Sequence, residues 1–384
     1  MVVARALRPI STRLRASRYI VDDPENNVTP YIANLVGKNL HQTENHPLYI
    51  IRKRIESYFG SDFEIFDNED PIVTTTQCFD DLLIPPDHPG RQKSDTYYVT
   101  KDSVLRTHTS AHQSQHLRAG HQKFLCTGDV YRRDEIDSSH FPAFHQMEGV
   151  KLLVDGSWTS RDEWLQSSDC EIVAKDLKTT LEGMVDHVFQ QGSSLEKRWR
   201  DDYFPFTEPS FELDILWQGE WMEVLGCGVI HTGVLERCDV SQKRGWAFGL
   251  GLERLAMVLF GIPDIRLFWT QDPRFHSQFT SGDIVQFKPY SKYPPVYKDI
   301  AFWLPENNNF EENDFFELAR ELAGDLVEQI ALIDKFKHPK TERTSCCYRV
   351  TYRSMDRSLT DVEINQIQDS LREKAALALH VQLR

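Results

Sequence analysis

The spacing of apolar and polar residues predicts both helices and strands in the first two thirds of the chain. Between residues 46 and 59, apolar side chains stand at positions 48, 51, 55 and 59, a spacing that predicts an amphipathic helix. Residues 209–217 and 220–230 alternate apolar and polar side chains, which is typical of half-buried antiparallel strands. Residues 122–131 and 144–154 predict two more strands around a polar loop. Together these patterns favour an antiparallel sheet.

Three other segments belong to the same region. Residues 159–193 predict a largely helical stretch, and residues 252–259 predict a short helix after Gly249 and Gly251. Residues 79–98 are rich in proline and turn residues, so we expect an ordered loop there. The two glycines do not indicate a dinucleotide-binding loop, because that motif needs a third glycine and an acidic ribose-binding residue.

From about residue 287 the pattern becomes that of a second, smaller domain. The predicted order is strand, helix, strand, strand, helix and strand, which is the ferredoxin-like pattern. Thr360 and Glu363 form a capping box at the start of the second helix. The predicted elements lie at residues 297–304, 314–326, 327–336, 345–352, 360–378 and 381–383. The sequence therefore predicts an α+β protein with two domains.

Length and composition agree with this organisation. A chain of 384 residues with 40% hydrophobic and 27% charged residues is typical of globular domains. No apolar run approaches the roughly 18 residues that a membrane span needs, so we expect no membrane partner. The seven cysteines are scattered and form no CxxC pair. This favours a reducing compartment over a disulfide framework or a cysteine-based zinc site.

Charge is distributed unevenly along the chain. The net charge of −14 argues against nonspecific coating of nucleic acid. Residues 335–357 nevertheless hold seven basic side chains against two acidic ones. A solvated strand face is one interpretation of this run, and a local RNA-binding patch is the other. The patch would use Lys335, Lys337, Arg349 and Arg353.

The first residues resemble a targeting segment. Residues 1–20 contain five arginines and no acidic residue, with serine, threonine and small apolar residues between them. Such a segment resembles a mitochondrial transit peptide, and a basic disordered arm is the alternative. We expect a leader over residues 1–27 and a location in the mitochondrial matrix.

Two blocks carry an arginine among glycines and aromatic residues. Arg132 lies within residues 128–148, and Arg254 lies within residues 246–257. A guanidinium is always charged and presents a planar fork of donors that fits phosphate oxygens, so the pair suggests a clamp on a polyphosphate. A structural ion pair is the alternative for each. The blocks resemble motifs 2 and 3 of the class II aminoacyl-tRNA synthetases, and within that class they resemble the phenylalanyl-tRNA synthetases.

The resemblance runs from about residue 28 to the C-terminus and implies a reaction. Residues 28–285 would form a class II catalytic domain, an antiparallel sheet flanked by helices. Residues 287–384 would form a ferredoxin-fold anticodon-binding domain. The implied ligase joins L-phenylalanine and ATP into phenylalanyl-adenylate and transfers the acyl group to the terminal ribose of tRNA(Phe) in mitochondrial translation. No second subunit type or editing module is evident in the chain, so we expect a monomer.

The resemblance also implies where ATP binds. Because the substrate carboxylate is itself the nucleophile, the protein has to position the reactants and stabilise charge on the α-phosphate. Arg132 is expected on the α-phosphate and Arg254 on the γ-phosphate, as the catalytic residues. Glu223 is expected beside the Mg²⁺ that accompanies ATP. The other expected ATP-binding residues are Ser139, His140, Phe144 and Gly251. Asp134 stands where many relatives have glutamate.

The implied phenylalanine pocket has an aromatic end and a polar end. Phe204 and Phe206, on one side of an extended strand, would contact the substrate ring. Ala247 would leave room at the para position, beside Phe248. Around the ammonium and carboxylate, the expected residues are His108, Ser110, Ala111, His112, Gln113, Gln146, Met147 and Glu148. The helical spacing of His108, His112 and His116 also suggests a metal site, but no carboxylate or cysteine partner is close in sequence.

Three other functions are open on the sequence alone. Intact Arg132, Glu223 and Arg254 oppose an enzyme-dead relative that only binds RNA. The apolar pocket opposes a class II synthetase for another aromatic amino acid, because tyrosine requires a partner for its hydroxyl. The incomplete glycine motif opposes a nicotinamide dehydrogenase.

Overall fold

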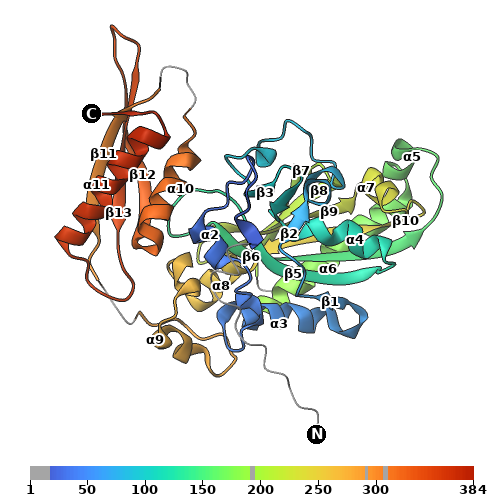
Figure 1. The fold of residues 1–384 in the computed structure, drawn as a ribbon. Coiled ribbons are helices and arrows are strands. Elements are labelled where there is room, and N and C mark those ends of the chain that lie inside the picture. Colours follow the sequence, from blue (N-terminus) through green and yellow to red (C-terminus); the bar gives the residue numbers. More distant parts are fainter. Residues whose placement is uncertain (1–17, 191–194, 290–292, 306–309) are drawn as a thin grey trace.

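The computed structural model describes residues 18–190, 195–289, 293–305 and 310–384 (Figure 1). Residues 1–17, the greater part of the expected leader, lie outside the described residues. The rest of that expected leader is attached to the larger domain. The Asn26 side chain donates hydrogen bonds to the carbonyls of Tyr19 and Val99 at 2.8 and 2.9 Å, and Tyr19 is buried.

A seven-stranded sheet forms the larger domain, in the order β1-β5-β6-β10-β9-β8-β7. Its first pair, β1 with β5, is parallel, and every other neighbouring pair is antiparallel. The strands are β1 (Glu64–Phe66), β5 (Lys123–Tyr131), β6 (Ala143–Asp155), β7 (Lys197–Phe204), β8 (Thr207–Trp217), β9 (Glu220–Ile230) and β10 (Lys243–Gly251). The four predicted strands at residues 122–131, 144–154, 209–217 and 220–230 are confirmed as β5, β6, β8 and β9.

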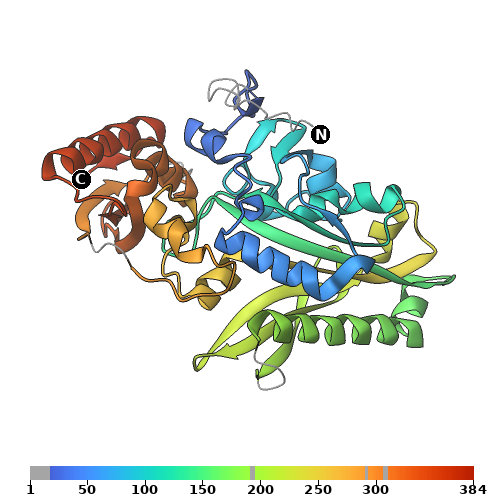
Figure 2. The ribbon, with the colours of Figure 1, turned by 90° about the horizontal axis from the view of Figure 1, so that it is seen from below.

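Helices cover one face of this sheet. The long helices α3 (Pro47–Phe59) and α6 (Ser168–Phe189) lie side by side on it (Figure 2), and α8 (Leu252–Phe260) packs against α3. Each of the long helices begins at a side-chain cap, because His46 accepts from the amide of Leu48 and Ser167 from that of Cys170. The short helices of this domain are α2 (Pro30–Leu35), α4 (Gln113–Arg118), α5 (Arg161–Leu165), α7 (Thr232–Arg237) and α9 (Pro273–His276).

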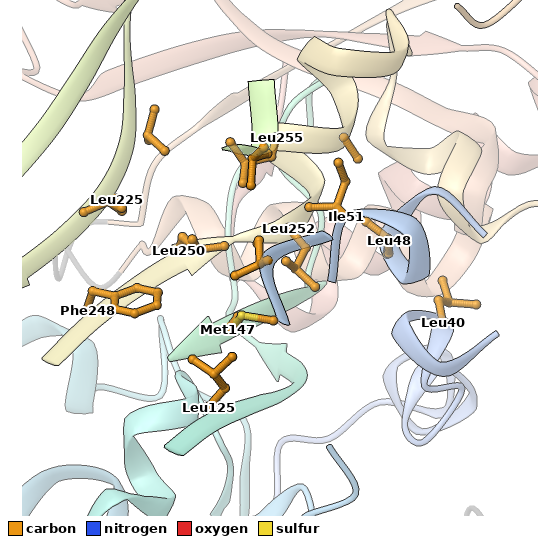
Figure 3. Packing of buried hydrophobic residues seen from close by; sticks show 14 of the residues in the cluster. Leu40, Leu48, Ile51, Leu125, Met147, Leu225, Phe248, Leu250, Leu252 and Leu255 are labelled. Atoms are coloured by element: carbon orange, nitrogen blue, oxygen red, sulfur yellow. The ribbon is translucent and has the colours of Figure 1, made fainter. Parts of the chain in front are cut away.

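The main apolar core lies between these helices and the sheet. Figure 3 shows Met147 of β6 and Leu252 of α8 in this layer, with Ile51 of α3 beside them, and all three are buried. Full burial of such a side chain stabilises the fold by roughly 1.5–3 kcal/mol. Strand residues that face this core cannot also face the opposite side of the sheet, because successive side chains alternate.

The opposite face of the sheet carries a smaller layer. A three-stranded sheet in the order β2-β4-β3 lies there with the short helix η5 (Thr109–His112) and α4 (Figure 1). Its strands are β2 (Ile72–Thr74), β3 (Tyr98–Thr100) and β4 (Ser103–Leu105). The proline-rich segment 79–98 is largely loop, as predicted, and belongs to this layer.

The C-terminal domain forms a separate lobe, at the left of Figure 1. Its four strands lie in the order β12-β13-β11-β14, and helices α10 and α11 pack together on this sheet. In chain order the elements are β11 (Val296–Trp303), α10 (Glu312–Ala323), β12 (Val327–Lys337), β13 (Thr344–Tyr352), α11 (Asp361–Ala378) and β14 (Gln382–Leu383). The predicted ferredoxin-like order is confirmed, and Thr360 caps α11 by accepting from the amide of Glu363. In the described part of the chain, no helix is both long and apolar enough to cross a membrane.

Candidate active site

A cavity of about 570 Å³ lies on the face of the large sheet opposite α3 and α6. Its walls come from the 79–98 loop, the segment around η5 and strands β6, β8, β9 and β10. The predicted site residues that line it are His108, Ser110, Gln113, Arg132, Gln146, Glu148, Phe204, Phe206, Glu223, Ala247 and Phe248. Residues predicted from distant parts of the sequence are therefore brought to one cavity.

Glu148 marks the polar end of this cavity. Its side chain is almost fully buried, and neither carboxylate oxygen has a hydrogen-bond partner of good geometry among the described residues. Burial raises the pKa of Glu148 to about 8, and the nearby Ser110 hydroxyl opposes this only in part. A buried carboxylate without a partner is costly, so the geometry favours a cationic group as its ligand.

Gln146 lies near Glu148 with a fixed side-chain orientation. Its Oε1 accepts a hydrogen bond from the amide of Thr109 at 3.1 Å, so its Nε2 remains free to donate. A Cβ at Gly249 would stand 2.7 Å from that Nε2, which explains why a glycine is needed opposite it. The side-chain Nε2 of Gln146 therefore presents its N–H donors to the cavity.

His108 is neutral in this environment. Burial and the neighbouring Arg132 guanidinium lower its pKa to about 3. Neither of its ring nitrogens has a hydrogen-bond partner of good geometry among the described residues. The imidazole thus offers one donor and one acceptor to a bound molecule.

Two phenylalanines form the aromatic end. Phe204 is the last residue of β7, Phe206 lies in the tight turn that follows, and their rings stack with centroids 5.9 Å apart. The prediction that both lie on one side of an extended strand was wrong, because the chain reverses at Pro205 and Phe206. A Cβ at Gly226 of β9 would stand 2.8 Å from Cζ of Phe204, so this glycine leaves space for the ring.

Ala247 and Phe248 have different surroundings although they are adjacent. Ala247 belongs to the apolar cluster on the cavity side of the sheet, together with partly buried Phe206. The Phe248 ring stacks on Phe59 of α3, with centroids 5.7 Å apart and planes at 12°, and so lies in the helix-side core. Phe248 borders the cavity, but its ring is not at the aromatic end. Successive residues of a strand face opposite sides of the sheet, so Ala247 and Phe248 cannot both point into the pocket, as the sequence had suggested.

Arg132 and Arg254 differ in their contacts. Nε of Arg132 donates to the carbonyl of Thr107 at 2.8 Å, and the guanidinium lies over the Phe144 ring, 5.3 Å from its centroid. The terminal nitrogens of Arg132 donate to no described residue. Arg254 is half-exposed, and its Nη1 lies 3.6 Å from Oε2 of Glu223. The first arginine lines the cavity, and the second reaches it through Glu223.

A family model for the class II core domain of tRNA synthetases (F) matches residues 30–279, and a model for the ferredoxin-fold anticodon-binding domain matches residues 291–384. The phenylalanine–tRNA ligase, chloroplastic/mitochondrial, of Arabidopsis thaliana is 52% identical over 94% of this chain and 84% of its own length. The mitochondrial phenylalanine–tRNA ligases of Dictyostelium discoideum and Mus musculus are 48% and 47% identical over 94% of this chain, and over 90% and 86% of their own lengths. The chain belongs to the phenylalanine–tRNA ligase family of class II synthetases. The fold class predicted from the sequence is thereby confirmed.

Some residues that were expected at the site of this class II synthetase lie outside the cavity. Met147 is completely buried in the helix-side core, on the face of β6 opposite to the one that carries Gln146 and Glu148, and Ala111 is buried in an apolar cluster beneath η5. Nε2 of His112 lies 2.9 Å from Nη1 of Arg106, so the imidazole supports the loop from behind. The prediction that these three side chains border the cavity was therefore wrong. Four expected ATP-binding residues are also outside it, namely Ser139, His140, Phe144 and Gly251.

The synthetase site holds a second acidic side chain that the sequence did not predict. Glu212 of β8 lines the cavity together with Glu223 of β9. Burial raises the pKa of Glu212, and the carboxylates of Asp202 and Glu223 add to this effect. The alternation of β8 indicated a strand, but only the pairing of β8 with β9 brings these acids together. Other lining residues that were missed include Asp95, Thr96, Thr107, Tyr203, Gly226 and Cys227.

The histidines at helical spacing do not gather as a metal site. His108 precedes η5, His112 contacts Arg106, and His116 lies 3.4 Å from Glu69. Within the described ranges, the one group with metal-ligand spacing is Glu135, Asp137 and His140. Nδ1 of His140 lies 2.7 Å from Oδ2 of Asp137, an interaction that raises the pKa of His140 against the effect of burial.

The basic run of the C-terminal domain is partly paired with acids. Arg349 makes two hydrogen bonds with the Asp299 carboxylate, at 2.8 and 2.9 Å, and Arg353 lies 3.3 Å from Glu328. Lys335 and Lys337 on β12 have no carboxylate within ion-pair distance among the described residues. The two lysines therefore keep their charge available to a ligand more fully than the two arginines.

Proposed function

We propose that this protein is an ATP-dependent phenylalanine–tRNA ligase. It forms phenylalanyl-adenylate from L-phenylalanine and ATP with release of diphosphate. It then transfers the phenylalanyl group to the terminal ribose of tRNA(Phe) and releases AMP. The observation that carries this is the polarity of one cavity, which has stacked Phe204 and Phe206 at one end and the buried Glu148 at the other. The Glu148 carboxylate has no hydrogen-bond partner of good geometry in the described part of the chain. A free amino acid with an aromatic side chain has the same polarity.

In this proposal the phenylalanine ammonium group binds Glu148. Charge-assisted hydrogen bonds are roughly twice as strong as neutral ones, and the ammonium would satisfy oxygens that otherwise lack partners. Gln146, Ser110, His108 and Gln113 complete the polar end of the cavity. The substrate ring lies against Phe204 and Phe206, and Ala247 limits the space at its para position.

The reaction itself needs positioning and charge stabilisation. The substrate carboxylate attacks the α-phosphate, a bond from that phosphorus to the carboxylate oxygen forms, and the bond to diphosphate breaks. Arg132 would contact the α-phosphate through the terminal nitrogens that donate to no described residue, and Arg254 would contact the γ-phosphate. His140, Ser139, Phe144 and Gly251 would surround the rest of ATP. The substrate supplies the nucleophile, so no general base is required.

We also propose that Mg²⁺ accompanies ATP at the acidic pair. Glu223 and Glu212 both line the cavity, and the Glu223 carboxylate adds to the burial that raises the pKa of Glu212, so a divalent cation between the two would be favoured. Mg²⁺ is usually held by one or two carboxylates together with phosphates and water, and it neutralises phosphate charge. Arg254 lies beside Glu223, so the same carboxylate would orient the arginine.

The two family matches support a division of the chain into two parts. Residues 28–285 would activate and transfer phenylalanine, and residues 287–384 would bind the anticodon end of the tRNA. In the second part, Lys335, Lys337, Arg349 and Arg353 would contact phosphates, and such contacts weaken as salt increases. The relatives named mitochondrial support the proposed location in the mitochondrial matrix. The presence of both family domains in one chain supports the proposed single-chain, monomeric enzyme.

ATP–pyrophosphate exchange with each of the twenty amino acids tests the proposed activation. We expect exchange with phenylalanine well above that with any other amino acid. Exchange that prefers another amino acid would refute the substrate, and a folded protein without exchange would refute the activity.

A further inference from the structure

The C-terminal domain contacts the chain segment that carries Arg132. This segment, residues 132–137, follows β5 and has no regular secondary structure. Arg132, Arg133 and Asp134 line the cavity. Because a segment without helix or strand hydrogen bonds does not fix its own backbone, contacts from outside must fix its conformation.

Arg320 of helix α10 makes the most direct of these contacts. Its Nη2 donates to the backbone carbonyls of Asp134 and Glu135, the latter at 2.5 Å. Its side chain is only 4% exposed. One planar guanidinium therefore holds two successive carbonyls, the first of them two residues beyond Arg132.

A buried carboxylate holds Arg320 in this orientation. Oε1 of Glu317 lies 2.6 Å from Nη1 of Arg320 and accepts a hydrogen bond from the Tyr97 hydroxyl at 2.7 Å. Tyr97 belongs to the larger domain and is completely buried. The arrangement therefore links both domains and leaves the guanidinium little freedom to turn away from the segment.

Further contacts come from the same domain. Asp314 lies 2.8 Å from Nη2 of Arg133, and Asn313 donates to the Arg133 carbonyl at 3.4 Å. The amide of Ile330 donates to the carbonyl of Ile136 at 3.0 Å, and the Ile136 side chain belongs to the apolar core of the C-terminal domain. The segment is thus packed into the C-terminal domain along most of its length.

We propose that Arg320 is a positioning residue for nucleotide binding, so that the docked C-terminal domain supports amino-acid activation and not only tRNA binding. The proposal rests on the proposed ligase function. When Arg320 holds the carbonyls of Asp134 and Glu135, Arg132 is kept close to the position in which it meets ATP. Loss of these hydrogen bonds would loosen the segment and weaken ATP binding, whereas the phenylalanine pocket would be unaffected.

The test is phenylalanine-dependent ATP–pyrophosphate exchange on the full chain without tRNA. For Arg320→Ala we expect the KM for ATP to rise about tenfold, the effect of losing hydrogen bonds to a charged group. The KM for phenylalanine should change by less than about twofold. Arg320→Lys keeps the charge beside Glu317 but loses the planar fork, and we expect it to raise the KM for ATP in the same direction.

Two control variants separate this role from general damage. Tyr31→Phe removes a different interdomain hydrogen bond, from the Tyr31 hydroxyl to Asp325 at 2.6 Å, that does not involve the segment. Lys374→Ala removes an exposed ion pair with Glu321. Both should keep the parental KM for ATP.

An unchanged KM for ATP in folded Arg320→Ala overturns the proposal, as does a rise of equal size in Tyr31→Phe. If Arg320→Ala does not fold, Arg320→Lys decides by the same criterion. A parent protein without phenylalanine-dependent exchange would instead overturn the proposed function. The two failures are therefore distinguishable.

Discussion

Glu253 accepts two hydrogen bonds from one residue, His145. Its Oε2 accepts from the backbone amide of His145 at 2.8 Å, and its Oε1 lies 2.7 Å from the imidazole Nδ1. Both side chains are buried. The pair joins the first turn of α8, which carries Arg254, to β6, which carries Gln146 and Glu148. The helix and the strand that supply opposite ends of the proposed site are thus fixed to each other.

Glu253→Ala should therefore destabilise the protein strongly. Removal of one member of a buried, hydrogen-bonded pair costs roughly 3–5 kcal/mol, because the partner is left without compensation. Urea unfolding followed by circular dichroism measures the change in the free energy of unfolding. Glu321→Ala, which breaks the exposed pair with Lys374, should cost less than about 1 kcal/mol. Equal effects of the two substitutions would contradict the assigned importance of the buried pair.

Glu148 should release a proton when phenylalanine binds. With its pKa raised to about 8, this carboxyl is mostly protonated at pH 7 in the empty cavity. An ammonium ligand favours the charged form and lowers the pKa, so a proton leaves on binding. Calorimetric titrations with phenylalanine at pH 7, in buffers of different ionisation enthalpy, should indicate release of nearly one proton. Glu148→Gln should show weaker binding and no release. Heats that do not depend on the buffer in the parent protein would exclude this role.

The same carboxyl should make the stability of the ligand-free protein depend on pH. Its folded-state pKa of about 8 lies above the ordinary value of 4.5. Stability from this group is therefore fully present below about pH 4.5 and is lost as the pH rises toward 8. Compared with Glu148→Gln, the parent should lose free energy of unfolding across this range. Chemical denaturation of both proteins at several pH values checks the difference, and parallel pH profiles would count against it.

Ala247→Gly should admit para-substituted phenylalanines. Ala247 belongs to the apolar cluster at the aromatic end, and removal of its methyl group enlarges the space there. A single methyl or methylene group in such a pocket changes discrimination by roughly 10–200-fold. We expect exchange with para-chlorophenylalanine to rise by at least about tenfold, while exchange with phenylalanine persists. If the variant still rejects the chlorinated substrate, another residue limits the space at the para position.

Arg254→Ala should abolish adenylate formation and leave the fold intact. The side chain is 53% exposed, so its loss should change the free energy of unfolding little. Loss of one stabilising donor of this kind lowers rates by roughly 10²–10³. Pyrophosphate exchange and thermal unfolding are measured together, with Lys374→Ala as the exposed control. Near-parental exchange in the folded variant would exclude Arg254 as a ligand of the γ-phosphate.

The sequence by itself determined most of the elements and the chemistry of several site residues. Helix α3 and strands β8 and β9 follow from local periodicity, and the cap at Thr360 follows from residues three apart. Such signals depend on neighbours along the chain, and a single sequence contains them in full. The motif resemblance added Glu148, Arg132 and Arg254 because their surroundings in the sequence are specific.

Only the tertiary structure decided how these residues meet. Phe204 ends β7 and Phe206 lies in the turn that follows, yet their rings stack. Phe248 points into the core, and Glu212 joins Glu223 through the pairing of β8 with β9. The contact between Arg320 and Asp134 joins residues 186 positions apart. Strand register, the side of the sheet that a residue faces and the docking of domains depend on packing between distant segments. No local pattern encodes that packing, and so the support that one domain gives to the other became apparent only in the folded chain.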